Sequence, residues 1–103
     1  RFMRALVFFD LPRTTSAESS VTARFVRDLR KEGFIMLQES VYCKLLLDKT
    51  AYDGTRARLE RMKPKKGNVI LLTVTERQFA SAEYLVGEYC GRDLAVTDRV
   101  VIL

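Results

Sequence analysis

The sequence of 103 residues contains 18 lysines and arginines, 13 aspartates and glutamates and no histidine, and its net charge is +5. This length, with 48% hydrophobic residues, indicates one small domain with a hydrophobic core. The lack of histidine excludes a histidine general base and any histidine-ligated metal, and the longest apolar run, five residues from Ala5 to Phe9, is too short to cross a membrane.

The cellular location is expected to be the cytoplasm. No charged segment precedes an apolar stretch of the kind found in export signals. The two cysteines, Cys43 and Cys90, lie far apart and form no CxxC motif. We therefore expect both to be small apolar side chains in a reducing compartment, and any metal site to consist of carboxylates, which favour Mg²⁺ or Mn²⁺.

The first half of the sequence predicts a strand, a helix and a long second strand. Residues 4–11 are apolar at successive positions, and Pro12 ends this strand. A capping box at residues 15–18 begins a helix, and Gly33 ends it. Residues 34–47 follow as a strand whose polar centre predicts a kink or a bulge. The expected core side of the helix carries an apolar residue at every fourth position: Ala17, Val21, Phe25 and Leu29.

The second half begins with another helix and strand. A capping box at residues 50–53 begins the helix, and a turn at 64–68 leads to an apolar strand at 69–74. A third capping box, at 75–78, begins a short helix. The core side of the longer helix is expected to contain Tyr52, Thr55, Leu59 and Met62. Three further elements are expected toward the C-terminus: an edge strand at 84–86, a loop at 87–98 and a last strand at 100–103.

This order is typical of an α+β, ferredoxin-like βαββαβ domain that spans residues 1–103. Right-handed crossovers place both main helices on one face of an antiparallel sheet. Residues 5–9 and 69–72 are nevertheless apolar on both faces of their strands. Because two helices cover only one face, we expect a second copy of the chain to cover the other, in a two-fold sheet-to-sheet homodimer.

The positive charge is concentrated in one segment. Residues 56–66 contain six basic residues and one glutamate, whereas the rest of the chain has equal numbers of both signs. Charge alone leaves two interpretations open: an anionic partner, or a solvated helix face whose basic end suits the helix dipole. A metabolic enzyme is not indicated, because the sequence has no glycine-rich phosphate loop and no cofactor motif.

Three segments of the sequence resemble a known family. They are FMRALVFFDLP at residues 2–12, GFIMLQESVY at 33–42 and PKKGNVILLTVTERQF at 64–79. In this order and spacing they resemble the Cas-two family, the small CRISPR-associated adaptation protein, in the version found in type II systems. The resemblance covers nearly the whole chain and implies a ferredoxin-like homodimer. It also implies a chain that starts a few residues inside the usual N-terminus and lacks a C-terminal tail.

The resemblance implies a function in CRISPR adaptation. The homodimer would bridge copies of the larger CRISPR integrase subunit and bind double-stranded protospacer DNA for spacer acquisition. The resemblance also implies a Mg²⁺-dependent endonuclease that cuts RNA or DNA, with Asp10 as the catalytic and metal-binding residue, paired across the dimer axis. Without the family, a cap for the turn before Pro12 is an alternative role for Asp10. The alternative function is a ferredoxin-like nucleic-acid-binding or regulatory module unrelated to CRISPR.

Two departures from the family pattern are present: Phe9 stands where members often have tyrosine, and the start of the first helix has Ala23 and Arg24 where many members have more arginines. They leave open whether the chain is itself an enzyme, and they do not affect DNA binding. We expect basic side chains to contact phosphates without reading bases. The residues expected to bind nucleic acid are Arg13, Arg24, Arg27, Lys44, Lys65, Lys66 and Arg77.

Overall fold

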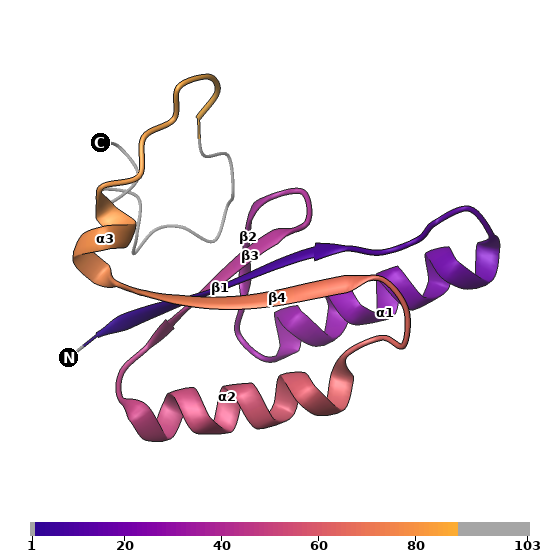
Figure 1. Ribbon diagram of the computed structural model, residues 1–103, viewed down its shortest axis with the longest axis horizontal. Coiled ribbons are helices and arrows are strands. Elements are labelled where there is room, and N and C mark those ends of the chain that lie inside the picture. The colour runs from indigo at the N-terminus through magenta and orange to yellow at the C-terminus, as the bar shows by residue number, and fades with distance from the viewer. Residues whose placement is uncertain (1, 89–103) are drawn as a thin grey trace.

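The computed structural model describes residues 2–88, which form one antiparallel four-stranded sheet with strand order β2-β3-β1-β4. The strands are β1 (Met3–Asp10), β2 (Ile35–Gln38), β3 (Val41–Leu46) and β4 (Asn68–Thr75). The helices are α1 (Ser16–Lys31), α2 (Lys49–Met62) and α3 (Glu76–Ala80). Figure 1 shows α1 and α2 side by side on one face of the sheet. The α+β, ferredoxin-like fold predicted from the sequence is confirmed.

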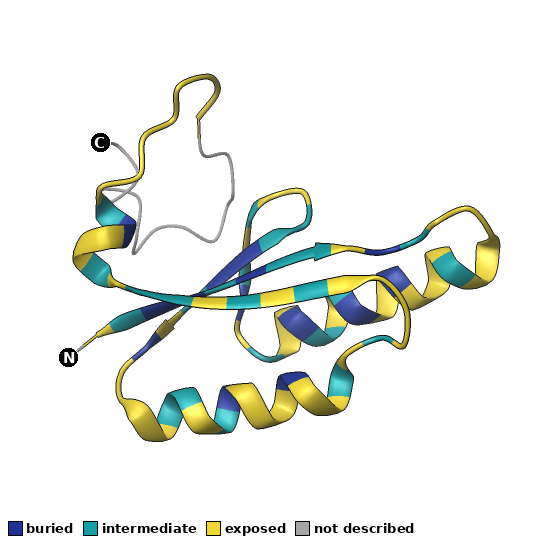
Figure 2. Ribbon diagram, viewed as in Figure 1, coloured by how far each residue is buried: buried dark blue, intermediate teal, exposed yellow. Residues whose placement is uncertain are grey.

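The sheet face beneath α1 and α2 contains the hydrophobic core. Ala5 and Val7 of β1 are completely buried and pack with Phe25 and Leu29 of α1 and with Leu59 of α2. In Figure 2 the buried positions on both helices lie on the side that faces the sheet. The predicted core stripe is confirmed on α2 and on the second half of α1, where Phe25 and Leu29 are buried. In the first half of α1 the prediction is wrong, because Ala17 and Val21 are exposed.

Two of the three predicted capping boxes are confirmed. The Thr15 hydroxyl accepts a hydrogen bond from the backbone N–H of Glu18, and the Glu18 carboxylate accepts one from the backbone N–H of Thr15. Thr75 and Gln78 form the same reciprocal pair at the start of α3. Each box satisfies two backbone donors that the helix itself leaves free.

The capping box predicted at residues 50–53 is wrong. Helix α2 begins at Lys49, because the side chain of Asp48 accepts a hydrogen bond from the backbone N–H of Ala51. An aspartate is as good an N-cap as a threonine. The start at Asp48 makes Thr50 a helical residue and leaves it exposed.

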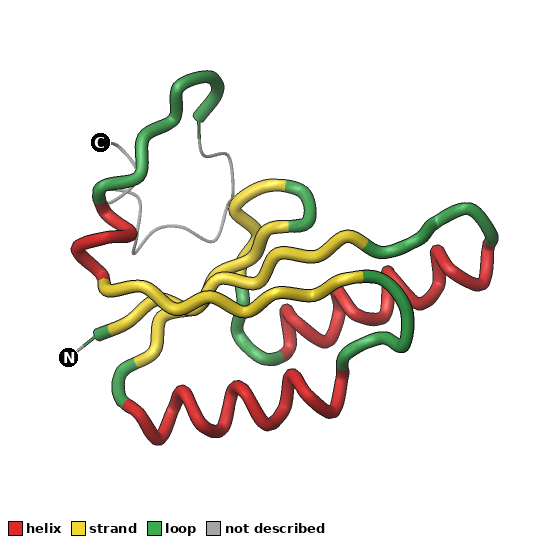
Figure 3. The backbone as a smooth tube through the Cα atoms, in the orientation of Figure 1, coloured by secondary structure: helices red, strands yellow, loops and turns green. Residues whose placement is uncertain are grey.

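The strand predicted at residues 34–47 is wrong as a single element. Figure 3 shows a loop between β2 and β3, which form a hairpin. Ser40 takes a positive φ of 69°, which a tight reversal requires, and its carbonyl accepts a hydrogen bond from the backbone N–H of Phe9 at 3.1 Å. A register shift between Met36 and Gln38 confirms the predicted bulge. The polar centre therefore contains a chain reversal as well as an irregularity.

The other face of the sheet is partly covered by α3. The Arg4 side chain lies under this helix, where its Nε donates to the Glu76 carboxylate at 3.1 Å and its guanidinium lies 4.5 Å from the centre of the Phe79 ring. Arg4 is only 3% exposed. Cys43 is buried nearby, and this burial raises the pKa of its thiol. The short third helix is thus fixed to one end of this face.

The remainder of that face, which we call the open face, is apolar and exposed. Ile70 and Leu72 of β4 are 58% and 46% exposed, and Leu45 of β3 is 39% exposed. The prediction that the strands are apolar on both faces is therefore confirmed. No part of residues 2–88 covers these side chains as α1 and α2 cover the core.

The predicted edge strand at residues 84–86 is wrong, because these residues form bends and coil. Leu85 and Val86 are 89% and 91% exposed. The predicted last strand at 100–103, most of the predicted loop at 87–98 and Cys90 lie outside the described residues.

Candidate metal and nucleic-acid site

Asp10 is the last residue of β1, and it is exposed. Because side chains alternate along a strand, Asp10 lies on the same face as Leu6 and Phe8, opposite the residues that pack against the helices. Its register partner on β4 is Asn68, so the two side chains share the open face. The sequence did not identify Asn68 as a site residue, although it is the last residue of the predicted turn at 64–68, which we call the basic turn because it contains Lys65 and Lys66.

The basic turn is fixed against the end of β1 by Gly67. This glycine has a φ of +89°, and a Cβ atom on it would lie 2.7 Å from the backbone oxygen of Asp10 and 2.9 Å from Leu11 Cδ2. Only glycine avoids both the backbone strain and the collision. Gly67 therefore brings Lys65 and Lys66, which precede it, close to the end of β1. The sequence predicted the turn but not this contact.

The other predicted DNA-binding residues are spread over several elements. Arg13, in the loop after β1, is exposed and lies 3.5 Å from the Glu39 carboxylate. Arg24 and Arg27 are exposed on α1. Arg77 is exposed on α3, which follows the opposite end of β4 from the basic turn. Within the part of the chain that the structure describes, the exposed basic residues without an ion pair include Arg24, Arg27, Lys65, Lys66 and Arg77.

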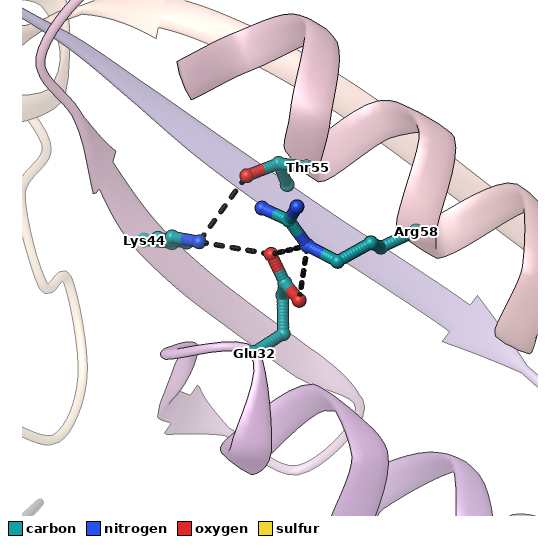
Figure 4. Close-up of polar contacts among 4 residues, drawn as sticks. All are labelled: Glu32, Lys44, Thr55 and Arg58. Atoms are coloured by element: carbon teal, nitrogen blue, oxygen red, sulfur yellow. Dashed lines mark hydrogen bonds and ion pairs between the residues drawn. The ribbon is translucent and has the colours of Figure 1, made fainter.

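Lys44 has a different environment, between the helices and the sheet. Its Nζ donates to Glu32 Oε2 at 3.1 Å and to Thr55 Oγ1 at 3.2 Å, and Arg58 Nε lies 2.7 Å from both oxygens of Glu32 (Figure 4). Burial raises the pKa of Glu32, but the hydrogen bonds from Arg58 and Lys44 outweigh this and lower the pKa overall. These four residues, the Glu32 cluster, connect the end of α1 with β3 and α2. We therefore leave Lys44 out of the proposed nucleic-acid surface.

The chemistry of Asp10 is suited to a hard cation such as Mg²⁺. Its carboxylate, together with the amide oxygen of Asn68, offers oxygen ligands. Among residues 2–88 no group of three or more histidine, cysteine, aspartate or glutamate side chains could hold a metal. A single chain therefore supplies one carboxylate here, and a metal would need ligands from water, substrate phosphate or a second copy.

Comparison with known proteins decides the family. The family model described as "CRISPR associated protein Cas2" matches residues 3–82. The chain belongs to the Cas2 family. It is 48% identical to a CRISPR-associated endoribonuclease Cas2 of Streptococcus mutans serotype c, over 98% of this chain and 93% of that protein. It is 44% identical to the protein of the same name from Treponema denticola, over 98% and 100% of the two chains.

A solved structure agrees with the Cas2 fold. The protein described as "Crystal structure of cas2" superposes with a TM-score of 0.60 at 20% identity, over 86% of this chain and 91% of that one. Membership of the Cas2 family gives the chain a CRISPR-associated role. The structure has no helix, within residues 2–88, that is long and apolar enough to cross a membrane.

Proposed function

We propose that the chain acts in CRISPR adaptation as a homodimer that binds double-stranded DNA and bridges the larger integrase subunits. The observation that carries this proposal is the position of Asp10 and the basic turn at one end of an uncovered apolar sheet face. Two copies that bury their open faces against each other would remove exposed Ile70 and Leu72 from water. The dimer would thereby display two copies of the same basic turn.

Phosphate contacts fit the character of the basic residues. The Gly67 contact fixes the backbone of the turn, so phosphate binding has to order only the side chains of Lys65 and Lys66. We expect duplex DNA of any sequence to bind, because lysine contacts with phosphates carry no base information. If five cations from each chain contact phosphates, the logarithm of the affinity falls with the logarithm of salt concentration with a slope of about −9. The five are Arg13, Arg24, Arg27, Lys65 and Lys66.

The DNA proposal is tested by exchanging both lysines of the turn. Lys65→Ala with Lys66→Ala should reduce the salt slope for a 30-base-pair duplex from about −9 to about −5, because the dimer loses four phosphate contacts. Lys31→Ala with Lys49→Ala removes the same charge elsewhere on the two helices and is the matched control. Equal slopes for the two double variants would contradict the proposal that the turn contacts DNA.

We also propose that Asp10 binds Mg²⁺ or Mn²⁺ and supports phosphodiester cleavage, as the name endoribonuclease of the relatives suggests. The bound metal would supply an activated water, and the Asp10 carboxylates of two copies would hold it. Asp10→Asn keeps the shape of the side chain and removes its charge. Metal-dependent cleavage of single-stranded RNA or duplex DNA should fall at least 100-fold, while binding of the duplex changes less than twofold. Cleavage that persists in the variant would place the activity elsewhere.

The dimer is tested separately, by charging the open face. Ile70→Asp puts a carboxylate where the second copy would pack, so sedimentation equilibrium should give the mass of one chain. Ala57→Asp makes the same charge change on the exposed side of α2 and should leave the dimer intact. A dimer that survives Ile70→Asp would exclude the open face as its interface.

A further inference from the structure

A groove lies between the first half of α1 and the C-terminal end of α2. Its volume is about 510 Å³, within the range of about 300–1,000 Å³ typical of binding sites. Val21 and Thr22 line one wall, residues 61–66 line the other, and Leu11 and Pro12 line the groove from the end of β1. In Figure 1 the first turns of α1 extend beyond the end of β1, so the sheet does not cover them.

The apolar side of α1 continues into this groove. Phe25 is 2% exposed and belongs to the core, whereas Val21, one turn earlier, is 46% exposed. Met62 and Pro64 face the groove from the other wall. The stripe predicted from the sequence as core is thus only half covered. An apolar ligand would gain by covering the rest.

Thr22 adds an unused polar group to the groove. The residue is 8% exposed, and its hydroxyl oxygen is buried without a hydrogen-bond partner in the described chain. Most buried hydroxyls are hydrogen-bonded, because an unpaired one is unfavourable. A ligand with a carbonyl oxygen would accept a hydrogen bond from this hydroxyl only after the Thr22 side chain turned toward the groove, because the oxygen is now buried.

The charges around the groove favour an acidic ligand. The carboxylate of Glu18 already accepts hydrogen bonds from Thr14 and Thr15. These bonds, together with nearby Lys66, lower the pKa of Glu18. Asp28 is the other acidic residue of the lining. Five basic residues outnumber them: Arg24, Arg61, Lys63, Lys65 and Lys66, of which, within residues 2–88, only Lys63 is paired with a carboxylate, that of Glu60 at 2.8 Å.

We propose that this groove binds a short acidic peptide segment of a partner protein. One or two aliphatic side chains of the peptide cover Val21 and Met62, a peptide carbonyl accepts from Thr22 once its side chain has turned into the groove, and carboxylates lie among the basic residues. An unpaired nucleotide fits less well, because the only aromatic ring in the lining, that of Phe25, is buried, so a base could stack only on the guanidinium of Arg24 or Arg61. Because Lys65 and Lys66 belong to both surfaces, peptide and DNA compete.

The test uses the full chain and an array of ten-residue peptides. Each peptide carries two leucines three or four positions apart among four to six glutamates. One control array replaces the leucines by serine at the same charge, and a second replaces the glutamates by lysine. Fluorescence anisotropy should give binding at least tenfold tighter for the first array than for either control. Equal binding of the serine and leucine arrays would overturn the proposal.

Variants then locate the site. Val21→Glu should weaken peptide binding at least tenfold, whereas Ala23→Glu, the same charge on an exposed position of α1 outside the lining, should change it less than twofold. Thr22→Val removes only the hydroxyl and should weaken binding several-fold with no loss of thermal stability. Equal effects of Val21→Glu and Ala23→Glu would overturn the proposal. It would also be overturned if Val21→Glu weakened duplex DNA binding alone, since the groove would then belong to the DNA surface.

Discussion

The two faces of the sheet are made from alternate residues of the same strands, and they differ in how they are covered. On the helix side, Val7 and Leu29 are completely buried by groups of the same chain. On the open face, Leu72 remains 46% exposed, whereas the leucine before it on β4, Leu71, is partly buried against the core. The sequences of the strands hardly distinguish the faces. The helices bring apolar stripes to one side of the sheet only, and they therefore decide which face is covered within a single chain.

The largest expected effect compares one leucine from each face. Leu29→Ala should lower the free energy of unfolding by about 3–4 kcal/mol, because it leaves a cavity in a closely packed core. Leu72→Ala, measured at low protein concentration, should cost about 1 kcal/mol or less, because much of the side chain is already in water. Urea denaturation measures both. Equal losses would mean that the open face is packed as tightly as the core.

The second prediction tests the contact between Gly67, in the basic turn, and the end of β1. Gly67→Ala should cost about 2–3 kcal/mol, from a positive φ together with a collision at the Asp10 carbonyl. Gly87 has a similar φ of +87° but open space around it, so Gly87→Ala isolates the conformational cost. If the two variants lose equal stability in urea, the contact with Asp10 does not constrain the turn.

The third prediction concerns the ion pairs on the helix side. Glu32→Gln should lower the free energy of unfolding by about 2 kcal/mol at pH 7, because it weakens charge-assisted hydrogen bonds with Lys44 and Arg58. The pKa of Glu32 is lower in the folded chain than the value of about 4.3 for a free glutamate. Its contribution is therefore complete above pH 4.3 and is lost as the pH falls toward the folded pKa.

Urea denaturation at several pH values checks this sign. The difference between wild type and Glu32→Gln should shrink as the pH falls from 7 to 3. The matched control is Asp53→Asn, which changes the exposed pair with Lys49, and surface pairs of this kind contribute little. A difference that stays constant with pH would show that the Glu32 charge does not stabilise the helix side.

How far the sequence predicted this molecule depends on how local each interaction is. The capping boxes at Thr15 and Thr75 were predictable because all their partners lie within three residues. The hairpin at Ser40 was missed because a serine, not the glycine or asparagine that usually marks a tight turn, takes the positive φ. At α2 two capping residues lay two positions apart, and local preference did not distinguish Asp48 from Thr50.

For the candidate site, too, the local features were predictable from the sequence and the long-range contacts were not. The end of β1 and the basic turn were each identified from the sequence, since both depend on neighbouring residues. The contact that joins them, Gly67 against Asp10, spans most of the chain and left no local signal. The Glu32 cluster is similar, because Lys44 and Arg58 come from separate elements and either could have been a free surface charge. The sequence therefore predicted Lys44 to bind DNA, whereas in the fold Lys44 pairs with Glu32 between the helices and the sheet.

The smallest expected change in the unfolding free energy of the isolated chain comes from a charge on the open face. This variant separates the stability of one chain from the stability gained by association. Leu72→Asp should lower the unfolding free energy of a single chain by about 1 kcal/mol, as Leu72→Ala does, because about half of the side chain is already in water. In the proposed homodimer, wild type gains stability with concentration, because association binds only folded chains. Its melting temperature should therefore rise across a hundredfold concentration range, and that of Leu72→Asp should stay constant. Leu29→Ala, which leaves the open face intact, should keep the concentration dependence at a lower melting temperature. A wild-type melting temperature independent of concentration would mean that the open face is stable in water without a second copy.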